Sequence, residues 1–552
     1  MKYFNYLCIA AFALLLCCAC EKQDEGTEPP VVTEEPDYLV MYYGIGGGTL
    51  DLFINGNIFQ ALDAGGDGKV VMTFQYKASA KWQEDHPAID GTRRFTSEEN
   101  AHLKGQLKSY SDLYPMLQWD KCDDLYAQLK SEKIGDADYD MVCSDSLTAF
   151  IKWSKEKYPK AKRTILVMAG HGRGWAIGED AKTDTRAILK DDNTKTFMSM
   201  NAVVNGVKNA GNVDLIYDDA CLMGMYETLY AYADCAKYLL ASMEATPEQG
   251  GEYITFINLL KEAGTTDGGL EEAMHKHCDH CVNDWWPKST YYFDIGFYNL
   301  TKLNSSLTPA LKNTVETLVN KFESNESIDP SKEGALPLGD SFGNYIRKAF
   351  MNCEIVDAHI IPDYGAFTDL MYERMEKDNV KKSEKEEVMF WLSSIYQAQD
   401  IEDMTLKVHV ANAVEYTSYQ SENSFSLTDL LRNLDNSLIE VGARNNPFGP
   451  LRKELISALK DVSYIKCVTP KPHTGIDEEY ELCSPGILIM PMQRKYYDVP
   501  VYSRHNYEVS PTNALEAYKL TAFDCQIGWS RMLEKLDVSP SFITNPTRGN
   551  VK

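Results

Sequence analysis

The chain has 552 residues, of which 81 are acidic and 55 are basic, and its formal net charge is −26. A hydrophobic share of 44% is enough for a packed core and excludes wholesale disorder. The acidic balance argues against nucleic acid as a partner, because a phosphate-binding face needs clustered Lys and Arg side chains. Length and charge therefore indicate a large globular protein and name no activity.

The first residues read as an export signal. Lys2 precedes an apolar run, Leu7–Ala19, that is too short to span a bilayer about 30 Å thick. The run ends at Cys20, and a small residue before such a cysteine resembles a bacterial lipobox, in which the cysteine is acylated and becomes the mature N-terminus. The alternative is an ordinary secretory signal.

Two N-terminal segments follow from this interpretation. We expect residues 1–20 to be a lipoprotein signal peptide and residues 21–37, which are acidic and Pro-rich, to be a solvated tether. Lipid on Cys20 would anchor the exported chain to the cell envelope, at the outer membrane or cell surface of a Gram-negative bacterium.

From Tyr38 onwards, short apolar runs alternate with segments of helical periodicity. The strand-like runs lie at 39–47, 69–77, 163–169, 213–219 and 237–243, and the helical segments at 146–159, 198–211 and 223–239. This alternation predicts an α/β fold with a largely parallel sheet covered on both faces. Ligand sites in such sheets lie at the carboxyl ends of the strands.

The second half of the chain is less regular. We expect residues 305–552 to form a mixed α/β extension packed on a core of residues 38–304, and a single helix over 517–536 near the C-terminus.

Two residues with nucleophile and base chemistry follow buried strands. His171 lies between Gly170 and Gly172, which let the backbone turn sharply, and Cys221 stands between a strand and a predicted helix, whose N-terminus favours a thiolate. Strand-end residues joined through a crossover helix can face one another across adjacent parallel strands. A cysteine with a histidine base is the minimum for acyl transfer through a thioester. The alternative is a buried cysteine and an unrelated loop histidine.

These segments resemble those of the clostripain-like cysteine peptidases, relatives of caspases, gingipains and legumain. The resemblance covers about Tyr38 to Leu536 and is dense between Asp145 and Tyr253. It rests on residues 146–175, 214–227 and 240–253, with weaker similarity at 39–51, 293–303, 486–492 and 529–533. The resemblance implies a caspase-like three-layer α/β sandwich and a catalytic dyad with no third member.

The resemblance also implies roles for individual residues. Cys221 would be the nucleophile, His171 its partner, and the backbone N–H groups of Gly172 and Cys221 the oxyanion hole. Asp219 would line the S1 pocket, where a carboxylate favours Arg or Lys at P1 because a buried guanidinium needs a charge-assisted partner.

A second S1 acid is expected from the loop after residues 237–243. Glu252 is the preferred match and Glu248 the alternative. The chain departs from the family here, because family members commonly have Trp-Asp where this sequence has Gly251 and Glu252.

Residues 178–196, between the histidine and the cysteine, are strongly polar. Family members are often activated by self-cleavage after a basic residue in this stretch, and we expect the cut after Arg186. The other candidates are Lys182, Lys190 and Lys195. The alternative is an uncleaved, solvated surface loop.

The segment His275–Cys281 holds five His and Cys side chains, which suggests zinc. On a helix, however, only side chains three or four residues apart share a face, and no second ligand pair is near in sequence. We therefore expect no metal here, and a helix-surface or disulfide role instead. The predicted chemistry requires no cofactor; the resemblance implies a possible calcium dependence without locating a site.

The sequence thus predicts an exported, lipid-anchored cysteine endopeptidase that acts as a monomer on proteins or peptides with Arg or Lys at P1. One alternative is a non-catalytic surface lipoprotein that captures glycan or protein, for which 33 Tyr and 8 Trp side chains could form platforms. Another is the same fold with lost activity, since Arg173 stands where many relatives have Gly.

Overall fold

A computed structural model of the protein describes most of the globular part of the chain. The described residues are 35–47, 50–105, 119–177, 185–191, 193–194, 196–244, 246–286, 293–324, 326–331, 341–352, 355–356, 423–468, 480, 484–489, 516 and 518–535. The predicted signal peptide, its Cys20 and most of the tether lie outside these residues. Within them, no helix has the length and apolar character needed to cross a membrane.

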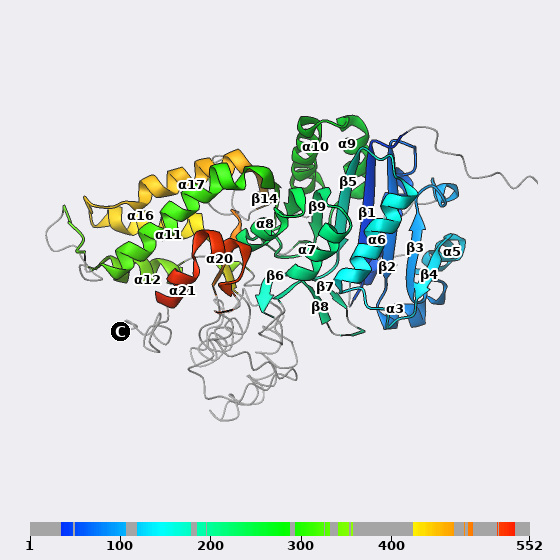
Figure 1. The fold of residues 1–552 in the computed structure, drawn as a ribbon, viewed down its shortest axis with the longest axis horizontal. Coiled ribbons are helices and arrows are strands. Elements are labelled where there is room, and N and C mark those ends of the chain that lie inside the picture. The colour runs from blue at the N-terminus through cyan, green and yellow to red at the C-terminus, as the bar shows by residue number, and fades with distance from the viewer. Residues whose placement is uncertain are drawn as a thin grey trace, which may run out of the picture.

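A sheet of nine strands, in the order β14-β11-β10-β9-β5-β1-β2-β3-β4, forms the centre of the described part (Figure 1). Its middle strands are parallel and consist largely of buried apolar residues, as is typical of the strands of a parallel sheet. They are β1 (Tyr38–Ile45), β2 (Val70–Lys77), β5 (Arg163–Ala169), β9 (Val213–Asp219) and β10 (Ala236–Ala241). Antiparallel strands complete both ends: β3 (Thr92–Thr96), β4 (Glu132–Gly135), β11 (Phe293–Asn299) and β14 (Ser463–Val468).

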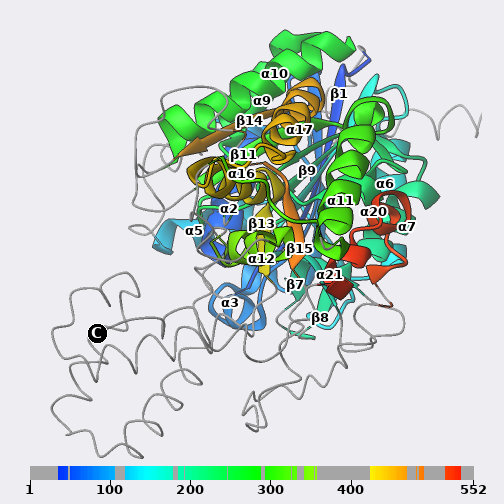
Figure 2. The same cartoon turned by 90° about the vertical axis from the view of Figure 1, so that its left-hand side faces the viewer.

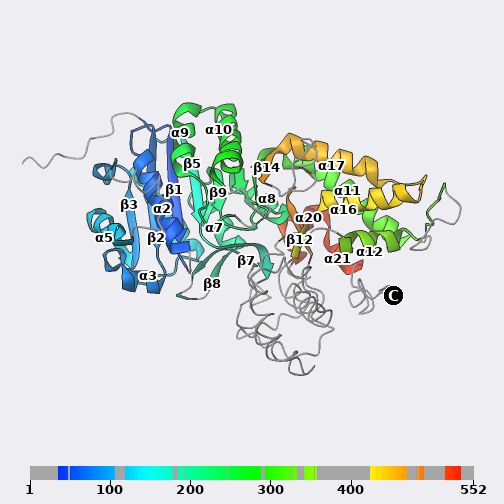
Figure 3. The ribbon, with the colours of Figure 1, turned by 180° about the vertical axis from the view of Figure 1, so that it is seen from behind.

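Helices cover both faces of this sheet. One face carries α6 (Ser144–Lys157), α7 (Met200–Asn209) and α8 (Tyr226–Tyr232) (Figure 1); the other carries α2 (Leu50–Ala64), α9 (Tyr253–Ala263) and α10 (Asp267–His280) (Figure 3). Alternate strand residues enter the two cores: Leu166 packs on the first side and Val167 on the second. The predicted α/β sandwich with a largely parallel central sheet is confirmed. The short helices α3 (Ala80–Asp85) and α5 (Trp119–Gln128) lie near the β3–β4 end.

A second, three-stranded antiparallel sheet follows β5. It consists of β6 (Gly172–Ile177), β7 (Thr185–Asp191) and β8 (Thr196–Ser199). The alternative of a solvated loop over 178–196 is therefore wrong for its second half. Ile188 and Leu189 of β7 are fully buried and pack in the hydrophobic core, although charged residues flank them in the sequence.

Four long helices pack beyond the β14 end of the sheet, facing the viewer in Figure 2: α11 (Thr308–Glu323), α12 (Phe342–Asn352), α16 (Leu427–Glu440) and α17 (Phe448–Val462). A small sheet of β12 (Ile355–Val356), β13 (Asn423–Ser426) and β15 (Gly486–Ile489) lies beside them. Their apolar faces continue the hydrophobic cluster that lies under α7 and α8.

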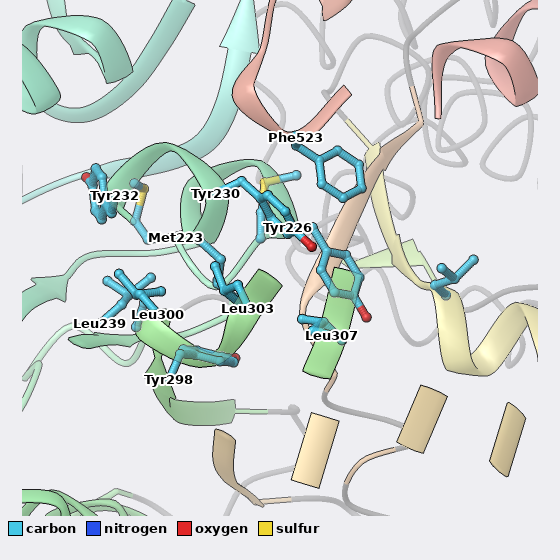
Figure 4. Close-up of a cluster of buried hydrophobic side chains, with 14 of the residues drawn as sticks. Met223, Tyr226, Tyr230, Tyr232, Leu239, Tyr298, Leu300, Leu303, Leu307 and Phe523 are labelled. Carbon is cyan, nitrogen blue, oxygen red and sulfur yellow. The ribbon is translucent and has the colours of Figure 1, made fainter. Parts of the chain in front are cut away.

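The C-terminal segment contains two short helices, α20 (Ala522–Ile527) and α21 (Ser530–Lys535), where one helix is predicted. Gly528 lies between them with φ at +74°, a left-handed conformation that ends α20. Phe523 of α20 stacks on Tyr226 and meets Tyr230 edge-on, with ring centroids 5.8 and 5.3 Å apart (Figure 4). The C-terminal segment thus packs directly on α8.

Candidate active site

His171 and Cys221 follow two neighbouring strands at equal distances. β5 and β9 are parallel neighbours, and their register pairs Ala169 with Asp219. Each candidate residue lies two positions beyond its member of that pair. The structure therefore brings both residues to the same carboxyl edge of the sheet, as their strand-end positions predict.

The glycines after His171 let its loop lie directly against the cysteine turn. A Cβ atom at Gly172 would fall 2.1 Å from the carbonyl oxygen of Cys221, and one at Gly174 would fall 2.7 Å from that of Leu222. No larger residue fits at either position without displacing the turn. The loop that carries His171 is thus in contact with the backbone of Cys221. The His171 side chain is half-buried.

Strand β7 supports the histidine loop. The Leu189 N–H donates a hydrogen bond of 2.7 Å to the carbonyl oxygen of His171, and Ile188 pairs with Gly172. The sequence does not predict this support; its local signal is the short apolar run Ala187–Leu189 between charged residues.

The turn at Cys221 has a strained backbone and is hydrogen-bonded to the segment that follows β10. Its thiol is half-buried and forms no disulfide, and Leu222 has φ at +62°, which costs of the order of 1–3 kcal/mol for a residue with a side chain. The N–H groups of Leu222 and Gly224 donate to the carbonyl oxygens of Glu244 and Ser242, at 3.1 and 2.6 Å. The thiol itself lies 3.8 Å from the Thr246 carbonyl oxygen. We call residues 242–244 the support loop.

The helix after Cys221 begins later than predicted. α8 starts at Tyr226, five residues beyond Cys221, and ends at Tyr232. A helix dipole acts mainly within the first turn, and Cys221 is not part of it. The prediction that a helix N-terminus favours the thiolate of Cys221 is therefore wrong, and His171 remains the group predicted to activate the thiol.

Asp219, the last residue of β9, is a buried carboxyl group two residues before the cysteine. It accepts hydrogen bonds from the Tyr253 hydroxyl at 2.8 Å and from the Gly251 N–H at 3.2 Å. Burial raises the pKa of Asp219 to about 6, against the lowering effect of these two donors. A carboxylate that is buried at the sheet edge is well suited to pair with a cationic side chain.

Glu252 follows Gly251, which binds Asp219, and its carboxylate caps a helix. Its carboxylate is the N-cap of α9, accepting from the N–H groups of Ile254 and Thr255 at 3.1 and 2.6 Å. It also lies 3.5 Å from Nε2 of His280. The structure thus gives Glu252 a role in helix capping, and its part in the S1 pocket stays a prediction. Glu248, the alternative, is exposed.

Three side chains of the His275–Cys281 segment lie in the core. His277, Cys278 and Cys281 are fully buried, which contradicts a helix-surface role, and both cysteines are thiols. Nε2 of His277 lies 3.5 Å from the Cys281 sulfur, and its ring packs on Tyr217. Burial lowers the pKa of His277 to about 3, so this ring is neutral. Among the residues described, no group of three or more His, Cys, Asp or Glu is placed to hold a metal ion.

The predicted cleavage site lies in a paired strand. Arg186 and Lys190 belong to β7, which hydrogen-bonds to β6 on one side and β8 on the other. A peptidase needs its substrate as an accessible extended segment, so cleavage after Arg186 requires β7 to unpair first. Lys182 and Lys195 lie outside the described residues.

Comparison with known proteins identifies the family. The sequence profile of the clostripain family matches residues 121–440, which is more than half of the chain. The chain belongs to the clostripain family. The matched region of this clostripain-family chain contains the His171 loop, the Cys221 turn and Asp219, so the family predicted from the sequence motifs is confirmed.

Individual relatives are more distant. The chain is 26% identical to clostripain from Hathewaya histolytica over 193 residues, which cover 32% of this chain and 36% of that protein. The match therefore spans about a third of the length of this curated relative. Among solved structures, the chain is similar to a secreted C11 cysteine protease from Bacteroides thetaiotaomicron in complex with an irreversible peptide inhibitor (11% identity, 90% of this chain, 99% of that chain, TM-score 0.45). It is also similar to an inactive zymogen C11 protease from Parabacteroides distasonis (12% identity, 90% of this chain, 99% of that chain, TM-score 0.46).

Proposed function

We propose that the protein is an exported, lipid-anchored cysteine endopeptidase that hydrolyses peptide bonds after Arg or Lys. The observation that carries the proposal is the register of β5 and β9, which places His171 and Cys221 at equal offsets on one sheet edge. The contact of Gly172 with the Cys221 peptide supports it, because it brings the two loops together. The lipobox-like end of the signal sequence supports anchoring at Cys20.

The reaction assigned to these residues is acyl transfer. His171 accepts the thiol proton as the sulfur of Cys221 attacks the scissile carbonyl carbon, and then donates a proton to the leaving amine as the C–N bond breaks. Water hydrolyses the resulting thioester and regenerates the thiol. The N–H groups of Gly172 and Cys221 are proposed to stabilise the oxyanion.

Asp219 is proposed to select the P1 side chain. Its buried carboxylate would pair with a guanidinium or ammonium group, and the low local dielectric would make that pair stronger than one at the surface. Glu252 is the second proposed acid of the pocket, although its carboxylate must then serve the substrate and the N-terminus of α9 together.

Hydrolysis of fluorogenic peptides tests this function. The purified protein should cleave peptides with Arg or Lys at P1, in the presence of reductant and Ca²⁺, and leave peptides with Ala or Gln at P1 largely intact. Cys221→Ala should abolish cleavage, whereas Cys143→Ala, which removes another half-buried thiol, should not change it. Activity that survives in Cys221→Ala would rule the proposal out and leave a contaminant or another nucleophile.

We also propose self-activation by cleavage between His171 and Cys221. Because Arg186 lies in the middle strand of its sheet, a cut after it should be slow. Mass spectrometry of wild type and Cys221→Ala, incubated in parallel, should show fragments only in wild type. Identical fragments in both would mean that another protease makes the cut.

A further inference from the structure

The support loop, which holds the cysteine turn, is itself held by one carboxylate. Asp294 of β11 accepts from the Met243 N–H through Oδ2 at 3.1 Å and from the Glu244 N–H through Oδ1 at 2.7 Å. The Ser242 hydroxyl donates to the carbonyl oxygen of Asp294 at 2.6 Å. Asp294 is fully buried, so these bonds are not exchanged with water.

The same loop residues face two ways. The N–H groups of residues 243 and 244 donate to Asp294, while the carbonyl oxygens of residues 242 and 244 accept from Gly224 and Leu222. The chain of contacts therefore runs from Asp294 through three loop residues to the amides of Leu222 and Gly224 in the turn after Cys221.

The ionised form of this carboxyl group is suited to the position because it offers two acceptors and no donor. Burial raises the pKa of Asp294 to about 7, and the N–H groups of Glu244 and Met243 oppose that rise by stabilising the charged form. An amide in its place would turn an NH₂ group toward one of the two N–H donors, so that one of these bonds is lost.

We infer that Asp294 is a positioning residue for Cys221: it fixes the support loop so that the strained turn holds the thiol in its reactive place. The kinetic part of this inference rests on the proposed peptidase function. Asp294 acts through the support loop, which it binds and which in turn binds the cysteine turn. Small misplacements of this kind can reduce the rate of a reaction about 100-fold without removing a reacting group.

Asp294→Asn tests the inference, with Asp214→Asn as the matched control. Asp214 is also a carboxylate of the central sheet that accepts a backbone N–H, that of Thr164 at 2.9 Å, but it lies at the amino end of β9, away from the cysteine turn. For each variant, kcat and KM are measured on an Arg-terminated peptide. The rate of alkylation of Cys221 by iodoacetamide is followed by peptide mass spectrometry.

Asp294→Asn should lower kcat about 10- to 100-fold, change KM less than about threefold and slow alkylation of Cys221 at least about fivefold. Asp214→Asn should leave kcat and the alkylation rate within about twofold of wild type. An unchanged kcat and alkylation rate in Asp294→Asn, or equal losses in both variants, would overturn the inference, because equal losses indicate a general loss of folded protein.

Two further measurements keep the outcome clear. If wild type hydrolyses no peptide, the proposed function fails, and the alkylation rates still decide the role of Asp294. If Asp294→Asn does not fold by circular dichroism, Ser242→Ala replaces it, because it removes the hydroxyl that donates to the backbone carbonyl oxygen of Asp294, one of the three bonds between Asp294 and the support loop. Ser242→Ala should slow alkylation about threefold, and an unchanged rate would contradict the inference.

Discussion

At the residue scale, two buried carboxyl groups near the cysteine have different surroundings. Asp219 receives a hydroxyl and one backbone N–H, and burial raises its pKa, so its charge is only partly compensated in the unliganded protein. Glu252 receives two N–H groups of a helix start, where a negative charge is stabilised. Asp219 is therefore the stronger candidate for a residue that gains by binding a cation.

Asp219→Asn should lower kcat/KM for Arg- and Lys-terminated peptides by about 100-fold or more, because a charge-assisted partner of the P1 side chain is lost. Glu252→Gln, which changes the second proposed acid, keeps a capping oxygen and should lower the same ratio by a smaller factor, about fivefold, because the Glu252 charge is already shared with the N-terminus of α9. Steady-state kinetics on one peptide series decides between them. A larger loss in Glu252→Gln than in Asp219→Asn would reverse the assignment of the two acids.

The pH dependence of Arg hydrolysis should report the ionisation of Asp219. Since its pKa is about 6 in the folded protein, kcat/KM for Arg peptides should fall below pH 6 as the carboxylate is protonated. The raised pKa also means that the fold binds this proton more tightly than the unfolded chain does. Its contribution to stability is thus present at low pH and lost as pH rises from about 4 through about 6. If kcat/KM of Asp219→Asn falls below pH 6 in the same way as that of wild type, the decrease does not come from protonation of Asp219.

The residues of the proposed dyad stand out in the sequence, and the residues that support their loops do not. His171 and Cys221 each follow a buried run and stand beside glycines or a family motif, which are local signals. Asp294 is 73 residues beyond Cys221, within an ordinary strand, and reaches the turn only because β11 pairs with β10. Its role depends on contacts between distant segments, which no local pattern encodes.

At the scale of elements, the small sheet beside His171 is tied to the central sheet by a buried ion pair. Nζ of Lys77, at the end of β2, lies 2.7 Å from Oδ2 of Asp191, at the end of β7, and both side chains are excluded from water. Lys77 also donates to the Tyr139 carbonyl oxygen at 2.8 Å. Because β7 carries the Leu189 N–H that supports His171, this pair helps to hold the histidine loop.

Lys77→Met should lower the free energy of unfolding by about 3–5 kcal/mol, because it leaves the Asp191 carboxylate buried without its cation. The double variant Lys77→Met/Asp191→Leu should recover much of that loss, since no buried charge remains. Urea denaturation followed by circular dichroism measures both. A single variant as stable as wild type would show that water reaches Asp191.

The strands of the central sheet were predictable because buried apolar runs in parallel sheets are nearly continuous. The strand β7 was missed because only two buried apolar residues, Ile188 and Leu189, distinguish it from a polar loop. The C-terminal helix was predicted as one element because its periodicity continues past Gly528. The positive φ of that glycine separates it into two.

At the scale of the whole molecule, the C-terminal segment is part of the core that supports the site. Phe523 packs on Tyr226 and Tyr230 of α8, the helix that follows the cysteine turn (Figure 4). The Tyr518 hydroxyl donates a hydrogen bond of 2.6 Å to buried Glu227. The sequence indicated an extension packed on the core. It could not show that the extension meets α8.

Phe523→Ala should lower the free energy of unfolding by about 3–5 kcal/mol, as expected for deletion of a buried aromatic ring. Leu520→Ala, three residues earlier, should have no measurable effect because Leu520 is 79% exposed. Thermal or urea unfolding of both variants makes the comparison. Equal stabilities would mean that α20 does not pack on α8 in solution.

The most direct test of the central claim is to locate the nucleophile. Wild-type protein is treated with an irreversible peptide inhibitor that carries Arg at P1 and an electrophilic ketone, and the modified residue is identified by peptide mass spectrometry. The expected result is a single adduct on Cys221, absent in Cys221→Ala and formed more slowly in Asp219→Asn. An adduct on any other cysteine, or equal labelling of wild type and Cys221→Ala, would contradict the assignment of Cys221 as the nucleophile.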